Sequence, residues 1–338
     1  SLPIPPSLKM QILPLGTVPR LLKGTPTFHP TRSKIKILRS SFMNDLTNKQ
    51  SGLLFGSYCA DALSLGVHWI YDANELAQKH GRITHYKPPG TDSYHPHKQA
   101  GDQGHVGDQA LCLLNFLLKE KIWDPSGFMD DWLGMWPDYN DYVDGATKTT
   151  LANIQNQTDK TQGGSDSVEI AGPARIAPLI VFLSNSSENE VVKAAVEQTM
   201  LTHRSKEAEE SAIFLAKAGY RLIHGANLLD TLNETAPEWA LKKADSVLSE
   251  NTVNAISKLG PACSISSALP SVLYLALKHG NDIETAFIEN AMAGGDNCAR
   301  GLVLGMLLGA ANGMASIPNY WIENLRARSD LVDFLNQI

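Results

Sequence analysis

Three side chains in two short polar segments have the type and setting for chemistry. Asp108 opens an apolar run, and Asp296 and Cys298 lie in the Gly-rich segment 294–298 that precedes another. Carboxylates can orient a metal or an attacking water, and a cysteine near a helix N-terminus should have a thiol pKa below the free value of about 8.5. Each has a structural alternative: an aspartate here is also an ordinary N-cap, and a cysteine is equally a small buried filler.

Polar, Gly-containing loops precede several of the expected helices. The starts of helices present unpaired N–H groups, so converging starts form a site for phosphates or carboxylates. Arg175 could bind a diphosphate with two hydrogen bonds, or could instead pair with Asp166 or Glu169. The candidate substrate-binding residues are therefore Gly145, Ala146, Thr147, Gly172, Arg175, Gly294 and Gly295.

Two further groups of residues admit both a functional and a structural interpretation. A His-x-His pair with a third histidine nearby can bind zinc, but without a clear further ligand the zinc site is disfavoured; these residues are His95, His97 and His105. A run of acids mixed with aromatics predicts a solvated helix edge over an aromatic anchor, or alternatively a wall that stacks adenine; these residues are Asp130, Asp131, Trp132, Trp136, Asp138, Tyr139, Asp141, Tyr142 and Asp144.

The elements that must position these residues are helices. Apolar residues recur at helical spacing from Ala208 to Leu222, and similar runs occur at 52–65, 107–119, 168–183, 190–202, 262–278, 284–292 and 297–313. Alternating, strand-like patterns are scarce. Gly301, Gly305 and Gly309 recur every four residues, which predicts one helix face that another backbone approaches closely. We expect one all-α domain over residues 45–338.

The composition excludes several classes of protein. The chain has 338 residues, 43% of them hydrophobic, and a net charge of −6, which disfavours nonspecific binding to nucleic acid. No apolar run reaches the roughly 18–20 residues of a membrane span, so we expect no membrane partner. The four cysteines form no Cys-x-x-Cys pair, which is typical of a reducing compartment; they are Cys59, Cys112, Cys263 and Cys298.

Residues 1–44 differ from the rest of the chain. They contain many prolines and several bases but no acid, so we expect a flexible basic leader that cannot bury enough surface to order itself. Such a leader resembles a transit peptide, or Met43 is the true start and the upstream residues are a mistaken extension. The protein is then cytoplasmic, or mitochondrial or plastid if the leader is genuine.

Several segments, taken in this order, resemble motifs of the ADP-ribosylglycohydrolase family. Residues 60–64 are similar to its Gly-Asp-Ala-Leu-Gly pattern, residues 106–109 to a Thr-Asp-Asp-Thr motif, and residues 294–299 to Gly-Gly-Asp-Thr-Asp-Thr. Residues 172–179 and the pair Thr202-His203 match two further segments. Residues 101–109, 144–147, 165–166, 171–179 and 295–298 are also similar to the J-crystallin and selenoprotein J branch. The resemblance implies a single large orthogonal helical bundle.

The resemblance also implies two Mg²⁺ ions, held by the Thr and Asp residues of two motifs, but this chain departs from those motifs. Asp108 and Asp296 remain, whereas Val106, Gly107, Cys298 and Ala299 replace the companion ligands, and His68 lies near the place of a further acid. Two carboxylates are too few to hold a pair of hard divalent ions, and a thiolate suits Mg²⁺ poorly. We therefore expect an incomplete site at Asp108 and Asp296, with Mg²⁺ bound weakly, singly or not at all.

The expected function follows from the resemblance and these departures. The first hypothesis is a hydrolase that acts on, or a protein that binds, an ADP-ribose-like ligand such as a nucleotide sugar or an ADP-ribosylated substrate. Its candidate catalytic residues are Asp108, Asp296 and Cys298, with the two aspartates facing each other across one anion-binding hollow. The alternatives are a non-catalytic, crystallin-like structural or binding protein, and thiol chemistry at Cys298.

Overall fold

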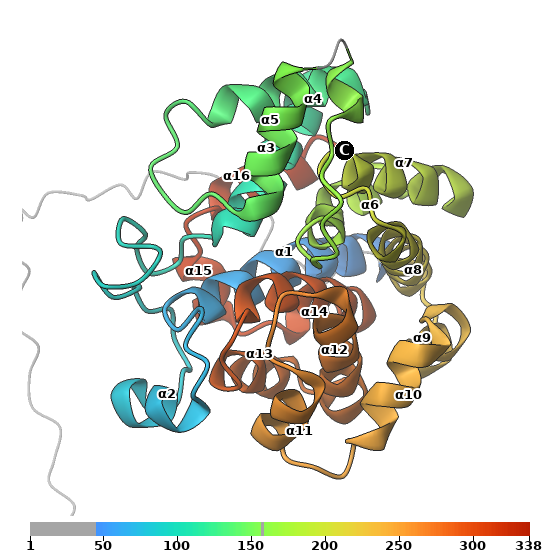
Figure 1. Ribbon diagram of the computed structural model, residues 1–338. Coiled ribbons are helices and arrows are strands. Elements are labelled where there is room, and N and C mark those ends of the chain that lie inside the picture. Colours follow the sequence, from blue (N-terminus) through green and yellow to red (C-terminus); the bar gives the residue numbers. More distant parts are fainter. Residues whose placement is uncertain (1–44, 157–158) are drawn as a thin grey trace, which may run out of the picture. The chain divides into compact units, whose positions relative to one another are not determined.

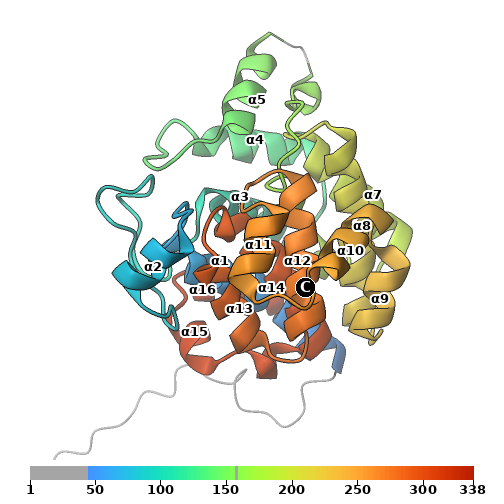
Figure 2. The same ribbon diagram turned by 60° about the horizontal axis from the view of Figure 1, so that its bottom comes forward.

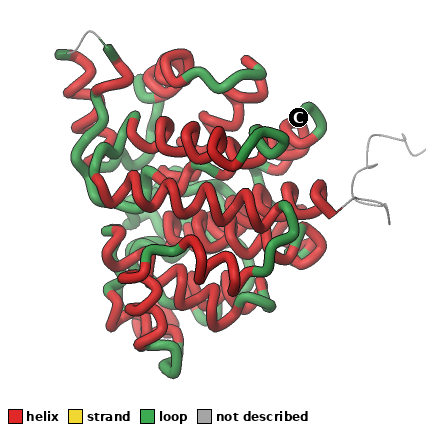
Figure 3. The backbone as a smooth tube through the Cα atoms, turned by 90° about the vertical axis from the view of Figure 1, so that its right-hand side faces the viewer, coloured by secondary structure: helices red, strands yellow, loops and turns green. Residues whose placement is uncertain are grey.

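The computed structural model describes residues 45–156 and 159–338, so the predicted leader lies outside the described residues. In chain order the α-helices are α1 (Asp45–Leu65), α2 (Ala73–His80), α3 (His105–Glu120), α4 (Pro125–Met135), α5 (Gly145–Gln155), α6 (Ala177–Phe182), α7 (Glu188–Met200), α8 (Lys206–Ile223), α9 (Leu228–Thr235), α10 (Glu238–Ser246), α11 (Thr252–Leu259), α12 (Ile265–His279), α13 (Ile283–Met292), α14 (Asn297–Asn312), α15 (Asn319–Asn324) and α16 (Arg328–Leu335). Short 3₁₀ helices η1 (Lys160–Gln162), η2 (Pro173–Arg175) and η3 (Met314–Ser316) complete the set. Over these ranges the chain forms no strand, only two isolated bridges, which confirms the all-α prediction (Figure 3).

Helices α1 and α14 lie side by side at the centre of the unit formed by Met43–Ile338 (Figure 1). Their contact is between backbones: a Cβ added to Gly305 would come within 2.0 Å of the Gly56 carbonyl oxygen, and one added to Gly309 within 1.9 Å of that of Gly52. The glycines therefore act in pairs, one from each helix. The close approach predicted for one face of α14 is confirmed, and its partner is α1.

The other helices cover this central pair. Helices α12 and α13 pack on α14, and α8 contacts both α14 and α7 (Figure 2). Because α1 is enclosed, every residue from Ser51 to Leu65 is buried, and α14 is buried from Asn297 to Ala310. Such all-round burial explains why neither helix has a clear apolar stripe.

One expected helix, at residues 168–183, is wrong in extent. Two prolines divide this segment, and the chain forms the short η2 followed by α6. Pro173 and Pro178 each occupy the first turn of their element, where the missing N–H costs nothing, but neither can lie inside a continuous helix. The absence of a long helix here leaves residues 165–172 as a loop that reaches the candidate site.

None of the helices that the structure describes is long and apolar enough to cross a membrane.

Candidate functional site

The glycine contact brings the end of α1 to the start of α14, although these segments are about 230 residues apart in sequence. A short backbone clasp joins the two: the Trp69 N–H donates to the Gly295 carbonyl at 2.9 Å, and the Gly295 N–H donates to the Ile70 carbonyl at 2.8 Å. Trp69, Gly294 and Gly295 all have positive φ, at 63°, 65° and 66°. A positive φ is uncommon for a residue as bulky as tryptophan and marks a backbone that its surroundings hold in place.

Four buried side chains form a continuous series of hydrogen bonds beside this clasp. Asp296 Oδ1 lies 3.1 Å from His68 Nε2, His68 Nδ1 lies 2.8 Å from His95 Nε2, and His95 Nδ1 lies 2.7 Å from Asp141 Oδ2. The four side chains are between 0% and 8% exposed. Asp296 occupies the N-cap position of α14 but makes no capping bond with its side chain, so the structural alternative of an ordinary N-cap is wrong. We call this series the Asp–His–His–Asp chain.

The two imidazoles meet as a hydrogen-bonded pair rather than as a bracket for a metal. The ring centroids of His68 and His95 are 5.0 Å apart and the facing nitrogens 2.8 Å apart, so the two distances differ by about two ring radii; the ring planes differ by only 12°. The nitrogens therefore point directly at each other. Two nitrogens bound to one zinc ion at about 2.0–2.1 Å each would lie farther apart than 2.8 Å in a tetrahedral site.

A third histidine lies against this pair. The ligand atoms of His68, His95 and His105 are all within 4.8 Å of one another, and all three residues are buried. His105 Nε2 is 3.5 Å from Asp144 Oδ2, whereas its Nδ1 is buried without a hydrogen-bond partner among the described residues. The histidine cluster weighed from the sequence therefore forms with His68 in the place of His97.

A pocket of about 410 Å³ lies at the Asp296 end of the Asp–His–His–Asp chain. Its polar lining consists of Asp144, Asp296, Glu169, His105 and Cys263, and its aromatic lining of Trp69, Tyr71, Tyr94 and Tyr142. Trp69 and Tyr142 meet edge to face with centroids 4.6 Å apart, and Tyr94 meets Trp69 in the same manner at 5.0 Å. This packing holds a tryptophan and two tyrosines at the pocket without requiring a ligand.

The ionisable groups of the pocket fall into two kinds. The pKa of Asp296 is lowered because its hydrogen bond to His68 and the nearby His68, His105 and Arg300 outweigh the effect of burial. The pKa of Asp144 is also lowered, by His105 and by the Thr147 N–H that donates to Asp144 Oδ1 at 2.6 Å. Burial, by contrast, raises the pKa of Glu169, and burial lowers that of His105 to about 4. At neutral pH the pocket thus holds ionised aspartates and a neutral histidine.

Asp108 is not among the residues that line this pocket. It lies in the first turn of α3, whose N-cap is Gly104, so Asp108 does not cap the helix. Its Oδ2 accepts from the ammonium of Lys98 and, at 2.6 Å, from the Tyr139 hydroxyl. Asp108 and Asp296 therefore bond to different side chains. The structure gives no support to the expectation that both aspartates line one anion-binding hollow.

Cys298 and Asp61 form a second buried contact next to the site. The Cys298 thiol is 3.7 Å from the Asp61 carbonyl oxygen, and Asp61 Oδ2 accepts from the Gly104 N–H at 3.0 Å. Burial raises the pKa of Cys298 well above its ordinary value, assisted by the charges of Asp61 and Asp296. The predicted lowering of this pKa is wrong in direction, because complete burial outweighs the start of the helix and Arg300. Burial likewise raises the pKa of Asp61 to about 8.

The residues present do not fit the pair of Mg²⁺ ions that the family resemblance implies. Lys98 and His68 already pair with the two remaining motif aspartates. A Cβ at Gly107 would come within 2.1 Å of Asp61 Oδ2, so no carboxylate fits at this position unless Asp61 moves. Mg²⁺ requires several ionised oxygen ligands in octahedral geometry, whereas here one aspartate is paired with an ammonium and the other with an imidazole.

The predicted substrate-binding residues separate into two sets. Gly145 lines the pocket at the start of α5, and Ala146 and Thr147 follow it in the first turn. Gly172 packs against the His203 ring, and Arg175 is completely buried, where its guanidinium donates to Gln109 Oε1 and Thr202 Oγ1. Neither Asp166 nor Glu169 pairs with it, and it joins α3, η2 and the end of α7 rather than reaching the pocket.

Gly294 and Gly295 are also used by the fold. The Gly294 N–H donates to Ala291 and that of Gly295 to Ile70, so neither amide is free for an anion. A Cβ at either position would come within 2.2 Å of a carbonyl oxygen, which explains why glycine occupies both. These two residues shape the clasp at the pocket and do not supply the predicted phosphate contacts.

Sequence reasoning treated the acid-rich segment as one unit, whereas the structure divides it. Asp130 and Asp131 lie on the exposed side of α4, as the solvated-edge interpretation predicts. Asp141 is buried against His95, and Tyr142 and Asp144 line the pocket. His68 was noticed only as a departure from the family pattern, and Trp69 and Glu169 were not selected as site residues, since neither belongs to a motif.

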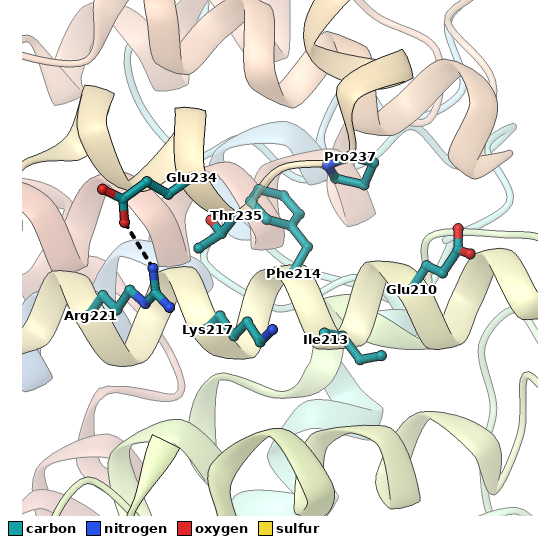
Figure 4. Close-up of a pocket in the computed structure, with 8 residues that line it drawn as sticks. All are labelled: Glu210, Ile213, Phe214, Lys217, Arg221, Glu234, Thr235 and Pro237. Atoms are coloured by element: carbon teal, nitrogen blue, oxygen red, sulfur yellow. Dashed lines mark hydrogen bonds and ion pairs between the residues drawn. The ribbon is translucent and has the colours of Figure 1, made fainter. Parts of the chain in front are cut away.

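A second pocket, of about 280 Å³, lies between α8 and the α9–α10 segment (Figure 4). Its charged residues include Arg221, which pairs with Glu234 at 3.0 Å and with Glu188 at 2.8 Å. Lys217 and Glu210 extend from the same helix along its wall. This pocket contains no histidine, cysteine or aspartate, so the pocket at Asp296 is the better candidate.

Comparisons with known proteins agree with this architecture. Residues 43–338 match the family model described as ADP-ribosylglycohydrolase. Crystallin J1A of Tripedalia cystophora is 23% identical over 316 residues, and Crystallin J1B of the same organism is 22% identical; each match covers 86% of this chain and 96% of the relative. A solved structure titled "ADP-ribosylglycohydrolase-related protein complex" superposes with a TM-score of 0.70 at 22% identity, over 87% of this chain and 98% of that one. The resemblance to the crystallin J branch is confirmed, and the chain belongs to the ADP-ribosylglycohydrolase family.

Proposed function

We propose that this chain hydrolyses a glycosidic bond to the ribose of an ADP-ribose-like ligand, such as a nucleotide sugar or an ADP-ribosylated substrate, without a divalent metal. One observation carries the proposal: the same pocket holds carboxyl groups whose pKa values are displaced in opposite directions. The pKa of Asp296 and Asp144 is lowered, and that of Glu169 is raised. Such divergence is typical of a site that needs both an acid and a base.

The roles follow from these directions. Cleavage of a glycosidic bond passes through an oxocarbenium-like transition state whose positive charge ionised carboxylates stabilise. In the proposed reaction Glu169 gives its proton to the leaving group, and Asp296 takes a proton from the attacking water. Asp144, fixed by the Thr147 N–H, supplies further negative charge. The proton gained by Asp296 and the one lost by Glu169 then exchange with solvent, which restores the starting state.

The lining of the pocket indicates how such a ligand is held. The aromatic side chains offer faces and edges against which adenine or ribose packs. No lysine or arginine is among the described residues that line the pocket, so a diphosphate is expected at the rim. There α5 begins at Gly145, and the exposed Lys148 ammonium lies 5.8 Å from the centroid of the Tyr142 ring.

The proposal is tested by binding and by turnover. ADP-ribose at millimolar concentration should raise the melting temperature equally in Mg²⁺ and in EDTA. Release of ADP-ribose from ADP-ribosylated substrates, followed by chromatography in EDTA, should fall about 100-fold or more in Glu169→Gln while the thermal shift is retained. Asp130→Asn, which changes an exposed carboxylate that pairs with Lys160, is the matched control and should leave both unchanged. Absence of both shift and product would contradict the proposal.

A second candidate is a non-catalytic, crystallin-like structural or binding protein. Two relatives bear the name crystallin, and the aspartates of the metal motifs are paired with this chain's own side chains. This candidate predicts a folded protein in which Glu169→Gln changes nothing measurable. Thiol chemistry at Cys298 is not proposed, because complete burial raises the pKa of this thiol and leaves no path for a substrate.

A further inference from the structure

The Asp–His–His–Asp chain can be counted proton by proton. Each end joins a ring nitrogen to a carboxylate, and an ionised carboxylate only accepts, so His68 Nε2 and His95 Nδ1 both carry protons. The central contact, from His68 Nδ1 to His95 Nε2, needs one proton between two nitrogens. The four nitrogens therefore share three protons, whereas two neutral histidines would supply only two.

We propose that the His68–His95 pair holds one resident buried imidazolium, and that this cation takes the electrostatic place of the Mg²⁺ implied by the family resemblance. Asp296 is then neutralised by a group that belongs to the chain itself. Lys98 acts in the same way on Asp108, the other remaining motif aspartate.

Charge balance supports this assignment. The buried charges next to the pair are the carboxylates of Asp141 and Asp296 and the guanidinium of Arg300. One imidazolium balances these three charges, whereas two neutral histidines would leave one negative charge uncompensated among buried groups, which is unfavourable.

The remaining ionisable groups that face the pair do not supply the missing charge. His105 stacks on both rings but is neutral, since burial lowers its pKa to about 4. Asp61 is protonated below about pH 8. Asp144, which contacts His105, adds negative charge and makes the need for a cation greater.

The extra proton belongs on a ring rather than on a carboxyl group. A carboxylic acid at Asp141 or Asp296 would satisfy the same geometry with both rings neutral, but the pKa of each of these groups is lowered. We assign the charge to the pair and not to either ring, because the central proton lies between His68 Nδ1 and His95 Nε2. His68 and His95 are thus positioning residues that keep Asp296 ionised. This inference concerns the resting protein and holds whether or not the proposed hydrolysis does.

Long-range ¹H–¹⁵N correlation spectra of the full chain labelled at histidine test the assignment, because they separate an imidazolium from either neutral tautomer. At pH 8 a free histidine with a pKa of about 6.5 is only about 3% charged. We expect one histidine to remain doubly protonated there. In Asp141→Asn the amide can donate to His95 Nδ1, so two protons suffice and this signal should disappear.

Asp130→Asn, which removes an exposed carboxylate that pairs with Lys160, is the control and should keep the signal. The proposal is overturned if the unaltered chain shows only neutral histidines at pH 8. It is also overturned if the purified chain retains a stoichiometric transition metal whose removal by chelator changes the His68 and His95 signals. If Asp141→Asn does not fold by circular dichroism, the spectrum of the unaltered chain decides the question by itself.

Discussion

Replacing Gly305 by alanine tests whether the backbone contact between α1 and α14 holds the fold and the site together. The added Cβ would come within 2.0 Å of the Gly56 carbonyl oxygen, whereas ordinary van der Waals contact begins at 3.4 Å. The two helices must therefore separate by about 1.4 Å. A carbonyl in the middle of a helix cannot rotate away, because it accepts the hydrogen bond of the next turn.

The expected loss is the cost of overpacking reduced by a gain in helix propensity. Overpacking a core costs about 1–3 kcal/mol and occasionally more, and the contact at Gly305 is between two backbones, so we take the upper end. Alanine in place of glycine inside a helix raises the free energy of unfolding by about 1 kcal/mol through its higher helix propensity. Gly305→Ala should therefore lower the free energy of unfolding by about 2–3 kcal/mol, or the melting temperature by roughly 4–10 °C.

Gly134→Ala is the matched control. Gly134 lies within α4, it is exposed, and a Cβ there would meet nothing within 4 Å, so the same substitution should stabilise by up to about 1 kcal/mol. Urea titrations followed by circular dichroism and tryptophan fluorescence measure both variants. A Gly305→Ala protein within about 0.5 kcal/mol of the unaltered chain would refute the reasoning, since this is the range of ordinary surface substitutions.

Three further predictions concern the site. Native Cys298 should resist iodoacetamide at pH 8 and react only after unfolding, because burial raises its pKa; alkylation of the folded protein at the rate of free cysteine would contradict this, as peptide mapping would reveal. The carboxyl of Asp61 binds its proton more tightly in the folded protein, where its pKa is about 8, than in the unfolded chain, where it is about 3.9. Protonated Asp61 therefore contributes fully to the free energy of unfolding below about pH 4. This contribution is lost as the pH rises toward 8, by up to about 1.4 kcal/mol per pH unit. Asp61→Asn should therefore gain stability relative to the unaltered chain between pH 5 and pH 8 in urea titrations, and a constant difference would oppose the assignment. Calorimetric titration with Mg²⁺ should reveal no pair of micromolar sites, and two such sites would show that Lys98 and His68 are displaced from the aspartates.

Much of the fold could be predicted from the sequence because its signals are local. Helical periodicity marks α7, α8 and α13 well, and the repeat of glycines in α14 indicates a close backbone neighbour. Nothing local identifies that neighbour as α1, since Gly52 and Gly56 acquire meaning only when the two helices meet. The helix expected at 168–183 was wrong because its apolar content was weighed above its two prolines.

The site was less accessible to sequence reasoning because its bonds join distant segments. Asp296 could be selected from its motif, but its partner His68 lies in an apolar stretch that has no pattern of its own. Asp108 belongs to an equally clear motif, yet its carboxylate bonds to Lys98 and Tyr139 and does not line the pocket. Cys298 shows the same limit, because the start of a helix is visible in the sequence and complete burial is not.

The pairing of α1 with α14 has a consequence for synthesis on the ribosome. Helix α1 ends at Leu65, whereas its principal partner begins at Asn297, so nearly the whole polypeptide must emerge before α1 can be enclosed. Until then the fifteen residues from Ser51 to Leu65, all destined for the interior, remain open to solvent. A nascent chain of this kind folds late and exposes an aggregation-prone segment for most of its translation. We therefore expect molecular chaperones to bind it during synthesis.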